Sequence, residues 1–173
     1  GSHLVGHSYG GLLAMVAATR CPERVKSLVL IEPPAFGVTI HHPEVANVVE
    51  RLKVVYESAD TPEDFLAGFL RALGTRPVEP LRLSSLHRKA VMATMEEVEP
   101  WNITLELARL ASYSFPKLVV SGDWHPALMV TAEALARELQ AQRFVIKGVG
   151  HEIQKMGKPF NDRLKELIHS AAN

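Results

Sequence analysis

A serine stands between two glycines near the start of the chain, in the run from Gly6 through His7, Ser8 and Tyr9 to Gly10. Apolar residues lead into this run and an apolar helical pattern follows it, which predicts a strand, a tight turn and a helix. Gly6 and Gly10 keep the turn free of side chains that would collide. The turn would lift the Ser8 hydroxyl clear of the sheet and place the Tyr9 backbone N–H at a helix N-terminus, where it stabilises developing negative charge. The pattern therefore predicts a nucleophilic serine.

A serine hydroxyl is a weak nucleophile at neutral pH unless a base accepts its proton and an acid orients that base. His151 is our candidate for the base, because it stands in a glycine-rich loop directly after the last predicted strand. His7 is interpreted as a packing or polar support for the site, because its side chain should point away from that of Ser8.

Two carboxylates compete for the role of the acid. Glu32 directly follows a short apolar run and precedes two prolines, and the carboxyl ends of parallel strands are where sites are built. Asp123 follows another short apolar run, but it is also suited to capping a turn. We favour Glu32 and keep Asp123 as the alternative.

These residues must be positioned by the elements around them. Short apolar runs alternate with helical patterns at both ends of the chain, which indicates an α/β fold with a parallel sheet. The predicted strands cover residues 3–6, 25–31, 116–121 and 143–147, and the predicted helices cover 11–20, 127–139 and 159–170.

The middle of the chain has no strand pattern. Prolines and charged residues there separate amphipathic helical stretches, predicted at residues 43–58, 62–73, 80–95 and 102–111. We therefore divide the chain into a core, residues 1–35 and 113–173, and a helical insertion, residues 36–112.

The composition argues against several classes of binding partner. Lysine and arginine number 19, as do aspartate and glutamate, so the formal net charge is zero and neither nucleic acid nor an anionic membrane is expected to bind. No apolar run reaches the ~18 residues of a membrane span. The single cysteine, Cys21, cannot form an internal disulfide, which favours a reducing, cytoplasmic location. The adjacent His41 and His42 lack further ligands at helical spacing and predict no metal site.

On the Gly-His-Ser-Tyr-Gly turn and the Gly-Val-Gly-His loop, the chain resembles the α/β-hydrolase superfamily. The resemblance implies the chain order serine, acid, histidine, with no cofactor, and makes the helical insertion a cap over the active site. In this family the acid most often stands three residues past a glycine after the seventh strand. Counting from Gly122, that position holds His125. Some members, haloalkane dehalogenases among them, carry the acid directly after the sixth strand, where this chain has Glu32.

The resemblance also implies that the chain starts on the family's fifth strand, so we expect it to be the C-terminal half or more of a longer protein. A second oxyanion donor normally comes from the loop after the third strand, and we expect this chain alone to be weakly active. Its first strand, at residues 3–6, would be an exposed edge, and exposed edges recruit other strands. We expect that edge to pair in a homodimer.

The resemblance finally implies a serine hydrolase that cleaves an ester, thioester or lactone bond of a small-molecule substrate. Perhydrolases and C–C bond hydrolases of the same fold are alternatives, as is a ligand-binding member without catalysis. Fold alone does not choose among them.

Overall fold

The computed structural model describes residues 1–78 and 80–171, which form two compact units. Unit 1 comprises Gly1–Thr39 and Pro100–Asn173, and unit 2 comprises Ile40–Glu99. Of the predicted core, Ala172 and Asn173 lie outside the described residues, as does Glu79 of the predicted insertion.

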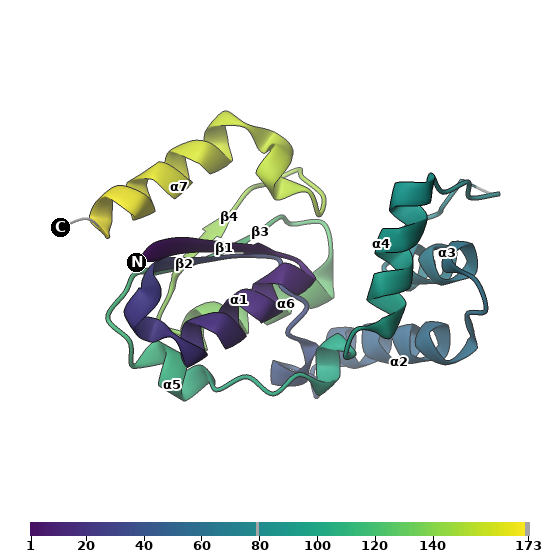
Figure 1. Cartoon of the computed structure of the whole chain (residues 1–173), viewed down its shortest axis with the longest axis horizontal. Coiled ribbons are helices and arrows are strands. Elements are labelled where there is room, and N and C mark those ends of the chain that lie inside the picture. The colour runs from purple at the N-terminus through teal and green to yellow at the C-terminus, as the bar shows by residue number, and fades with distance from the viewer. Residues whose placement is uncertain (79, 172–173) are drawn as a thin grey trace. The chain divides into compact units, whose positions relative to one another are not determined.

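Unit 1 is built on a four-stranded parallel sheet with the order β1-β2-β3-β4 (Figure 1). The strands are β1 (Ser2–His7), β2 (Val25–Ile31), β3 (Lys117–Ser121) and β4 (Gln142–Val145). The two inner strands are almost entirely buried, as expected for parallel strands covered on both faces. The α/β class and the parallel sheet predicted from the sequence are therefore confirmed.

The sheet separates two apolar layers, because successive side chains of a strand point to opposite faces. On β2, Leu28 and Leu30 pack with helices α1 and α6, whereas Val29 and Ile31 pack with helix α7. Figure 1 shows α7 on one side of the sheet and the other helices of unit 1 on the opposite side. The helices of this unit are α1 (Tyr9–Arg20), α5 (Leu107–Ala111), α6 (Pro126–Glu138) and α7 (Lys158–Ser170).

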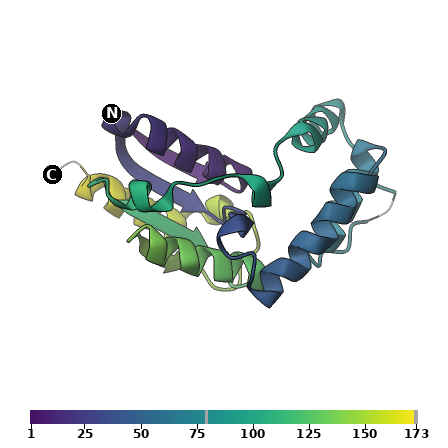
Figure 2. The same ribbon diagram turned by 90° about the horizontal axis from the view of Figure 1, so that it is seen from below.

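Short elements complete unit 1. Figure 2 shows the segment that carries α5 running between α1 and α6, and Leu110 of α5 joins their apolar layer. The 3-10 turns are η1 (Pro22–Arg24), η2 (Phe36–Val38), η3 (Pro100–Asn102) and η4 (Ile153–Met156). Within the described strands β1 pairs with β2 alone, so the expected pairing of this edge between two copies of the chain stays a prediction.

Unit 2 contains the helices α2 (Pro43–Ser58), α3 (Pro62–Ala72) and α4 (Ser85–Glu96). Each begins with a side-chain cap: His42, Thr61 and Ser84 accept hydrogen bonds from backbone N–H groups in the first turn. Helices α2 and α3 pack together through aromatic contacts such as the edge-to-face pair of Tyr56 and Phe65. No described helix of either unit is both long and apolar enough to cross a membrane.

Two predicted helices are shorter than expected. The helix predicted at residues 80–95 begins only at Ser85, because Ser84 caps it and the stretch before it starts with a proline. The helix predicted at 102–111 is helical only from Leu107. The residues between η3 and Leu107 include the β-branched Ile103 and Thr104, which are poor helix formers.

The turn between β1 and α1 brings two backbone segments into direct contact. A Cβ atom added at Gly6 would lie 2.4 Å from the carbonyl oxygen of Gly10 and 2.6 Å from the Cα of Gly11. Distances this short are excluded by sterics, and the neighbouring atoms are backbone, so no side-chain rotation relieves them. Gly6 therefore lets the end of β1 touch the start of α1.

We predict that Gly6→Ala lowers the free energy of unfolding by about 3 kcal/mol, at the upper end of overpacking effects. The prediction that a side chain at Gly10 would collide across the turn is wrong, because a Cβ atom there meets nothing within 4 Å. Gly10→Ala is therefore the matched control, and alanine favours the helix. Urea unfolding followed by circular dichroism measures both. Equal stability of the two variants would contradict this description of the turn.

Candidate active site

Ser8 occupies the turn at the carboxyl end of β1 in a strained backbone conformation, with φ 53° and ψ −129°. A positive φ is uncommon for a residue with a side chain. Two backbone hydrogen bonds hold the turn: the N–H of Ser8 donates to the Ile31 carbonyl at 2.9 Å, and the N–H of Gly11 donates to the Ser8 carbonyl at 2.8 Å. Tyr9, the first residue of α1, follows directly, so its backbone N–H lies at the positive end of that helix.

Glu32 repeats this arrangement at the end of the neighbouring strand. Its φ is 44°, and its backbone N–H donates to the Val120 carbonyl at 2.9 Å, which extends the ladder between β2 and β3 by one residue. The side chain is only 1% exposed. Backbone strain at two adjacent strand ends is characteristic of functional sites, where the surroundings enforce it.

The structure brings the Glu32 carboxylate to the His151 ring. The Nδ1 of His151 lies 2.7 Å from Oε2 of Glu32, and the imidazole remains 31% exposed. Two further donors hold the carboxylate: the Gly122 N–H contacts Oε1 at 2.8 Å, and Nε1 of Trp124 contacts both oxygens, at 3.1 and 3.0 Å. Three N–H groups from three separate positions thus surround one buried charge.

The balance of these contacts decides the charge of Glu32. Burial raises the pKa of a carboxyl group, but the hydrogen bonds from His151, Trp124 and Gly122 oppose it and leave the pKa of Glu32 below its ordinary value. Glu32 is therefore a carboxylate at neutral pH. Because a carboxylate can only accept, Nδ1 of His151 carries the hydrogen, so that the neutral form of the imidazole has its acceptor at Nε2. This is the form that a general base needs.

His7 supports the histidine loop from the end of β1. Its Nε2 donates to the backbone carbonyl of His151 at 2.9 Å, and the two rings lie 4.5 Å apart between centroids. Its Nδ1 faces the amide nitrogen of Gln154 at 3.5 Å. Burial, and then the proximity of His151, lower the pKa of His7 below its ordinary value. A neutral His7 bound to a backbone carbonyl is suited to holding the loop.

Asp123, the other candidate acid, makes its hydrogen bond to the histidine loop. Its Oδ1 accepts from the backbone N–H of Gly148 at 2.8 Å, which ties the loop after β3 to the histidine loop. The same two loops approach closely at Gly122, where a Cβ atom would lie 2.4 Å from the Val149 carbonyl oxygen. Of the two acids considered from the sequence, the structure therefore brings Glu32 to the His151 ring, and it gives Asp123 a contact that fixes the loop.

Trp124 is a residue of the candidate site whose contact with Glu32 the sequence did not reveal. Its position was visible, since it follows Gly122 and Asp123 at the end of a predicted strand. Its indole N–H is a donor, and a buried carboxylate at the neighbouring strand end needs donors. An indole donor that follows one strand and a carboxylate that follows the neighbouring strand could therefore have suggested this hydrogen bond from the sequence.

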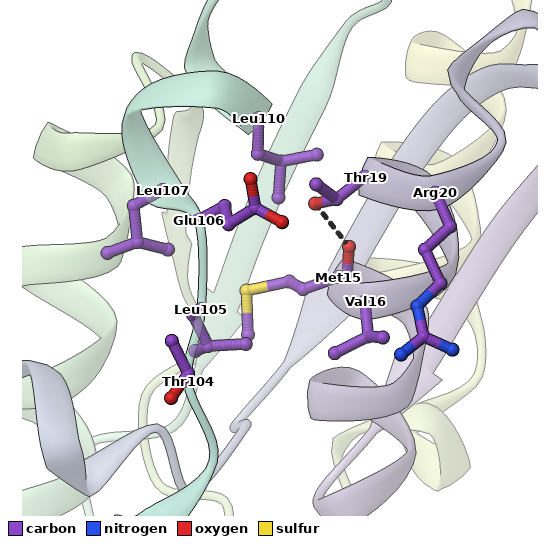
Figure 3. A pocket seen from close by; sticks show the side chains of 9 residues that line it. All are labelled: Met15, Val16, Thr19, Arg20, Thr104, Leu105, Glu106, Leu107 and Leu110. Atoms are coloured by element: carbon purple, nitrogen blue, oxygen red, sulfur yellow. Dashed lines mark hydrogen bonds between the residues drawn. The ribbon is translucent and has the colours of Figure 1, made fainter.

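A cavity of about 90 Å³ lies at the other end of α1 (Figure 3). Its walls are side chains of α1 between Met15 and Arg20 and of the segment between Thr104 and Leu110. None of the residues that line it is a candidate catalytic residue. Since a helix rises ~1.5 Å per residue, Met15 is roughly 10 Å along the axis from Ser8. The cavity is thus separate from the candidate active site.

The remaining histidines considered from the sequence do not assemble into a metal centre. Within residues 1–78 and 80–171, no group of three or more His, Cys, Asp or Glu side chains is placed to hold a metal ion. His42 has a different contact, because its Nδ1 accepts from the Glu44 N–H at 3.4 Å at the start of α2.

Comparison with known proteins gives a family match over most of the chain. Residues 1–163 match the profile described as "Alpha/beta hydrolase family". Among curated proteins, the chain is 24% identical over 163 residues to "Lipase 3" of Moraxella sp. (strain TA144), covering 87% of this chain and 50% of that protein. It is 25% identical over 162 residues to "Lipase 1" of Psychrobacter immobilis, covering 86% and 49%. The chain thus spans about half the length of these relatives.

Solved structures agree on the fold. MenH from S. aureus superimposes with a TM-score of 0.63 at 20% sequence identity, covering 98% of this chain and 68% of the MenH chain. Identity at this level supports the architecture alone.

We predict a pH-dependent contribution of Glu32 to stability. Because its pKa in the folded protein is lowered, the ionised group stabilises the fold above the ordinary glutamate pKa of about 4.3, and this contribution is lost as the pH falls through the lower folded-state pKa. The unfolding free energy of the wild type minus that of Glu32→Gln should therefore be larger at pH 7 than at pH 4 and below. Urea unfolding across this range measures it.

Glu23→Gln is the control for loss of a surface charge, since the Glu23 side chain is 69% exposed. A wild-type advantage over Glu32→Gln that grows on acidification would contradict the lowered pKa.

Proposed function

The chain belongs to the alpha/beta hydrolase family, and on that premise we propose that it is a serine hydrolase that cleaves ester, thioester or lactone bonds of small molecules. The observation that carries the proposal is the 2.7 Å contact between His151 and the buried Glu32, at the strand end next to Ser8. A base oriented by an ionised acid, where that acid directly follows the strand next to the one that leads into a serine on a strained turn, is an arrangement suited to nucleophilic acyl transfer.

In the proposed mechanism the Ser8 hydroxyl oxygen attacks the acyl carbon while Nε2 of His151 accepts the hydroxyl proton. The negative charge that develops on the carbonyl oxygen is stabilised by the Tyr9 backbone N–H at the start of α1. His151 then gives the proton to the leaving group as the bond to it breaks, which leaves an acyl group on Ser8. Water, deprotonated by His151, releases the acid product and restores Ser8.

Glu32 remains ionised throughout this cycle. It holds Nδ1–H of His151, so that Nε2 faces the reaction, and it stabilises the imidazolium that forms when the proton arrives. The lowered pKa of Glu32 supports this role. A protonated Glu32 would have no charge to stabilise the imidazolium and would not fix the hydrogen of His151 on Nδ1.

The lipases among the curated relatives support an acyl ester as the substrate class. We also propose that the helices of unit 2 serve as the family's cap. Among the described residues we identify one candidate oxyanion donor, the Tyr9 N–H, and lack of a single donor typically lowers the rate by about a hundred- to a thousand-fold. Turnover by this chain alone should accordingly be weak but dependent on Ser8.

We predict that Ser8→Ala reduces hydrolysis of p-nitrophenyl acetate and butyrate to the uncatalysed background. Glu32→Gln should lower kcat by a factor on the order of 10³–10⁴, because the amide fails to hold the imidazole in the required form. Asp123→Asn is the matched control: it should retain kcat within about fivefold, because its contact is to the Gly148 N–H. Steady-state rates on samples of verified intact mass measure all three.

Two results would overturn the assignment. Turnover that survives Ser8→Ala would remove the serine as nucleophile. A loss in Asp123→Asn that matches or exceeds the loss in Glu32→Gln would give the acid role to Asp123. Absence of any turnover, together with saturable ligand binding, would instead favour a non-catalytic member of the family.

A further inference from the structure

Trp124 contacts the Glu32 carboxylate in a distinctive way. Its single Nε1–H lies 3.1 Å from Oε1 and 3.0 Å from Oε2. A donor at nearly equal distance from both oxygens lies close to the line that bisects the carboxylate. From there it resists rotation of the carboxylate in either direction.

The other two donors do not provide this restraint. The Gly122 N–H contacts Oε1 alone, and Nδ1 of His151 contacts Oε2 alone. With only Gly122 as a fixed donor, the carboxylate would be free to turn about that one contact and carry Oε2 away from the imidazole. Trp124 is the second fixed point, and two fixed points determine where Oε2 stands.

The indole ring also belongs to the surroundings of the acid. Trp124 is half-buried, Glu32 is 1% exposed, and the centroids of the Trp124 and His151 rings lie 6.0 Å apart. Low local polarity strengthens hydrogen bonds to a charge. A donor lost at this position would leave the carboxylate buried with one contact fewer, which is costlier than the same loss at the surface.

We propose that Trp124 is a positioning residue, whose indole N–H holds the Glu32 carboxylate in the orientation that presents Oε2 to His151. This inference rests on the proposed hydrolase function. Trp124 acts through Glu32 and has no contact with the reacting atoms in the mechanism above.

The first test is a double-mutant cycle on ester hydrolysis. Trp124→Phe keeps an aromatic ring and removes the donor, and it should lower kcat about tenfold with little change in KM. In the Glu32→Gln background the same substitution should change kcat by less than twofold, because the charge through which Trp124 acts is gone. Trp101→Phe makes the same substitution at the half-buried tryptophan of η3, so it is the matched control and should behave as the wild type.

The pH dependence of stability gives a second readout. Removing a donor makes Glu32 easier to protonate, so the contribution of the ionised carboxylate to the unfolding free energy, measured against the matching Glu32→Gln variant, should be lost at a higher pH in the Trp124→Phe background than in the wild type. The charged or titratable neighbours of Glu32 are His151, His7 and Arg143, and the substitution leaves all three in place. An equal loss of kcat in both backgrounds, with the Glu32 contribution to stability lost at an unchanged pH, would show a merely structural tryptophan and overturn the proposal.

Proton NMR of the His151 Nδ1–H separates this proposal from the proposed function. The signal should be shifted downfield in the wild type and in Trp101→Phe, and broadened or lost in Trp124→Phe while near-ultraviolet circular dichroism stays unchanged. That behaviour in a chain without Ser8-dependent turnover would overturn the hydrolase function and support the positioning contact. An unchanged signal in Trp124→Phe, in a chain that does turn over esters, would overturn the positioning role alone.

Discussion

A buried negative charge at the carboxyl edge of the sheet is the constraint on which the site depends. Glu32 is almost inaccessible to water, and an isolated carboxylate in that place would take up a proton instead of remaining ionised. It stays charged because N–H groups of Gly122, Trp124 and His151 converge on it. Glu32 therefore stays ionised only if the loops after β3 and β4 hold these N–H groups in position.

The positions of those two loops depend on further contacts with backbone atoms. Gly122 lets the end of β3 approach the Val149 carbonyl, and Asp123 bonds the Gly148 N–H. His7 fixes the carbonyl of His151 from the other side. The His7 contact joins segments 144 residues apart in sequence, the histidine loop and the strand that leads into Ser8. The candidate site is thus a property of the whole sheet edge and of no single loop.

Much of this architecture was predictable, because the relevant signals are local. The bounds of β2, Val25–Ile31, and of α2, Pro43–Ser58, were predicted as they are found, since proline, apolar periodicity and capping residues mark their ends. The predicted start of α4 at Pro80 is wrong although Ser84 is a good N-cap, because a proline is also common at the first position of a helix and the sequence offers both signals. A helix from Asn102 was wrong because apolar periodicity outweighed the poor helix propensity of Ile103 and Thr104.

The contact partners within the site were harder to predict, because hydrogen-bond geometry arises only when strand ends meet. The sequence left Glu32 and Asp123 in competition, and nothing local distinguishes a carboxylate that contacts an imidazole from one that contacts a loop N–H. The sequence gives no sign of the role of the Trp124 indole N–H, since that donor matters only beside a buried acceptor at the end of the adjacent strand.

The arrangement explains how an acid can stand one strand away from its commonest place in the resembled family. Strands β2 and β3 are neighbours, so a carboxylate at the end of either one lies near the same histidine loop. In the proposed site the acid, Glu32, directly follows β2, and the loop after β3 supplies two of its hydrogen-bond donors, Gly122 and Trp124. The loop after β3, where the family's acid most often stands, instead donates hydrogen bonds to the Glu32 carboxylate. An acid at the end of β2 therefore requires donors at the end of β3, and the two strand ends form one site.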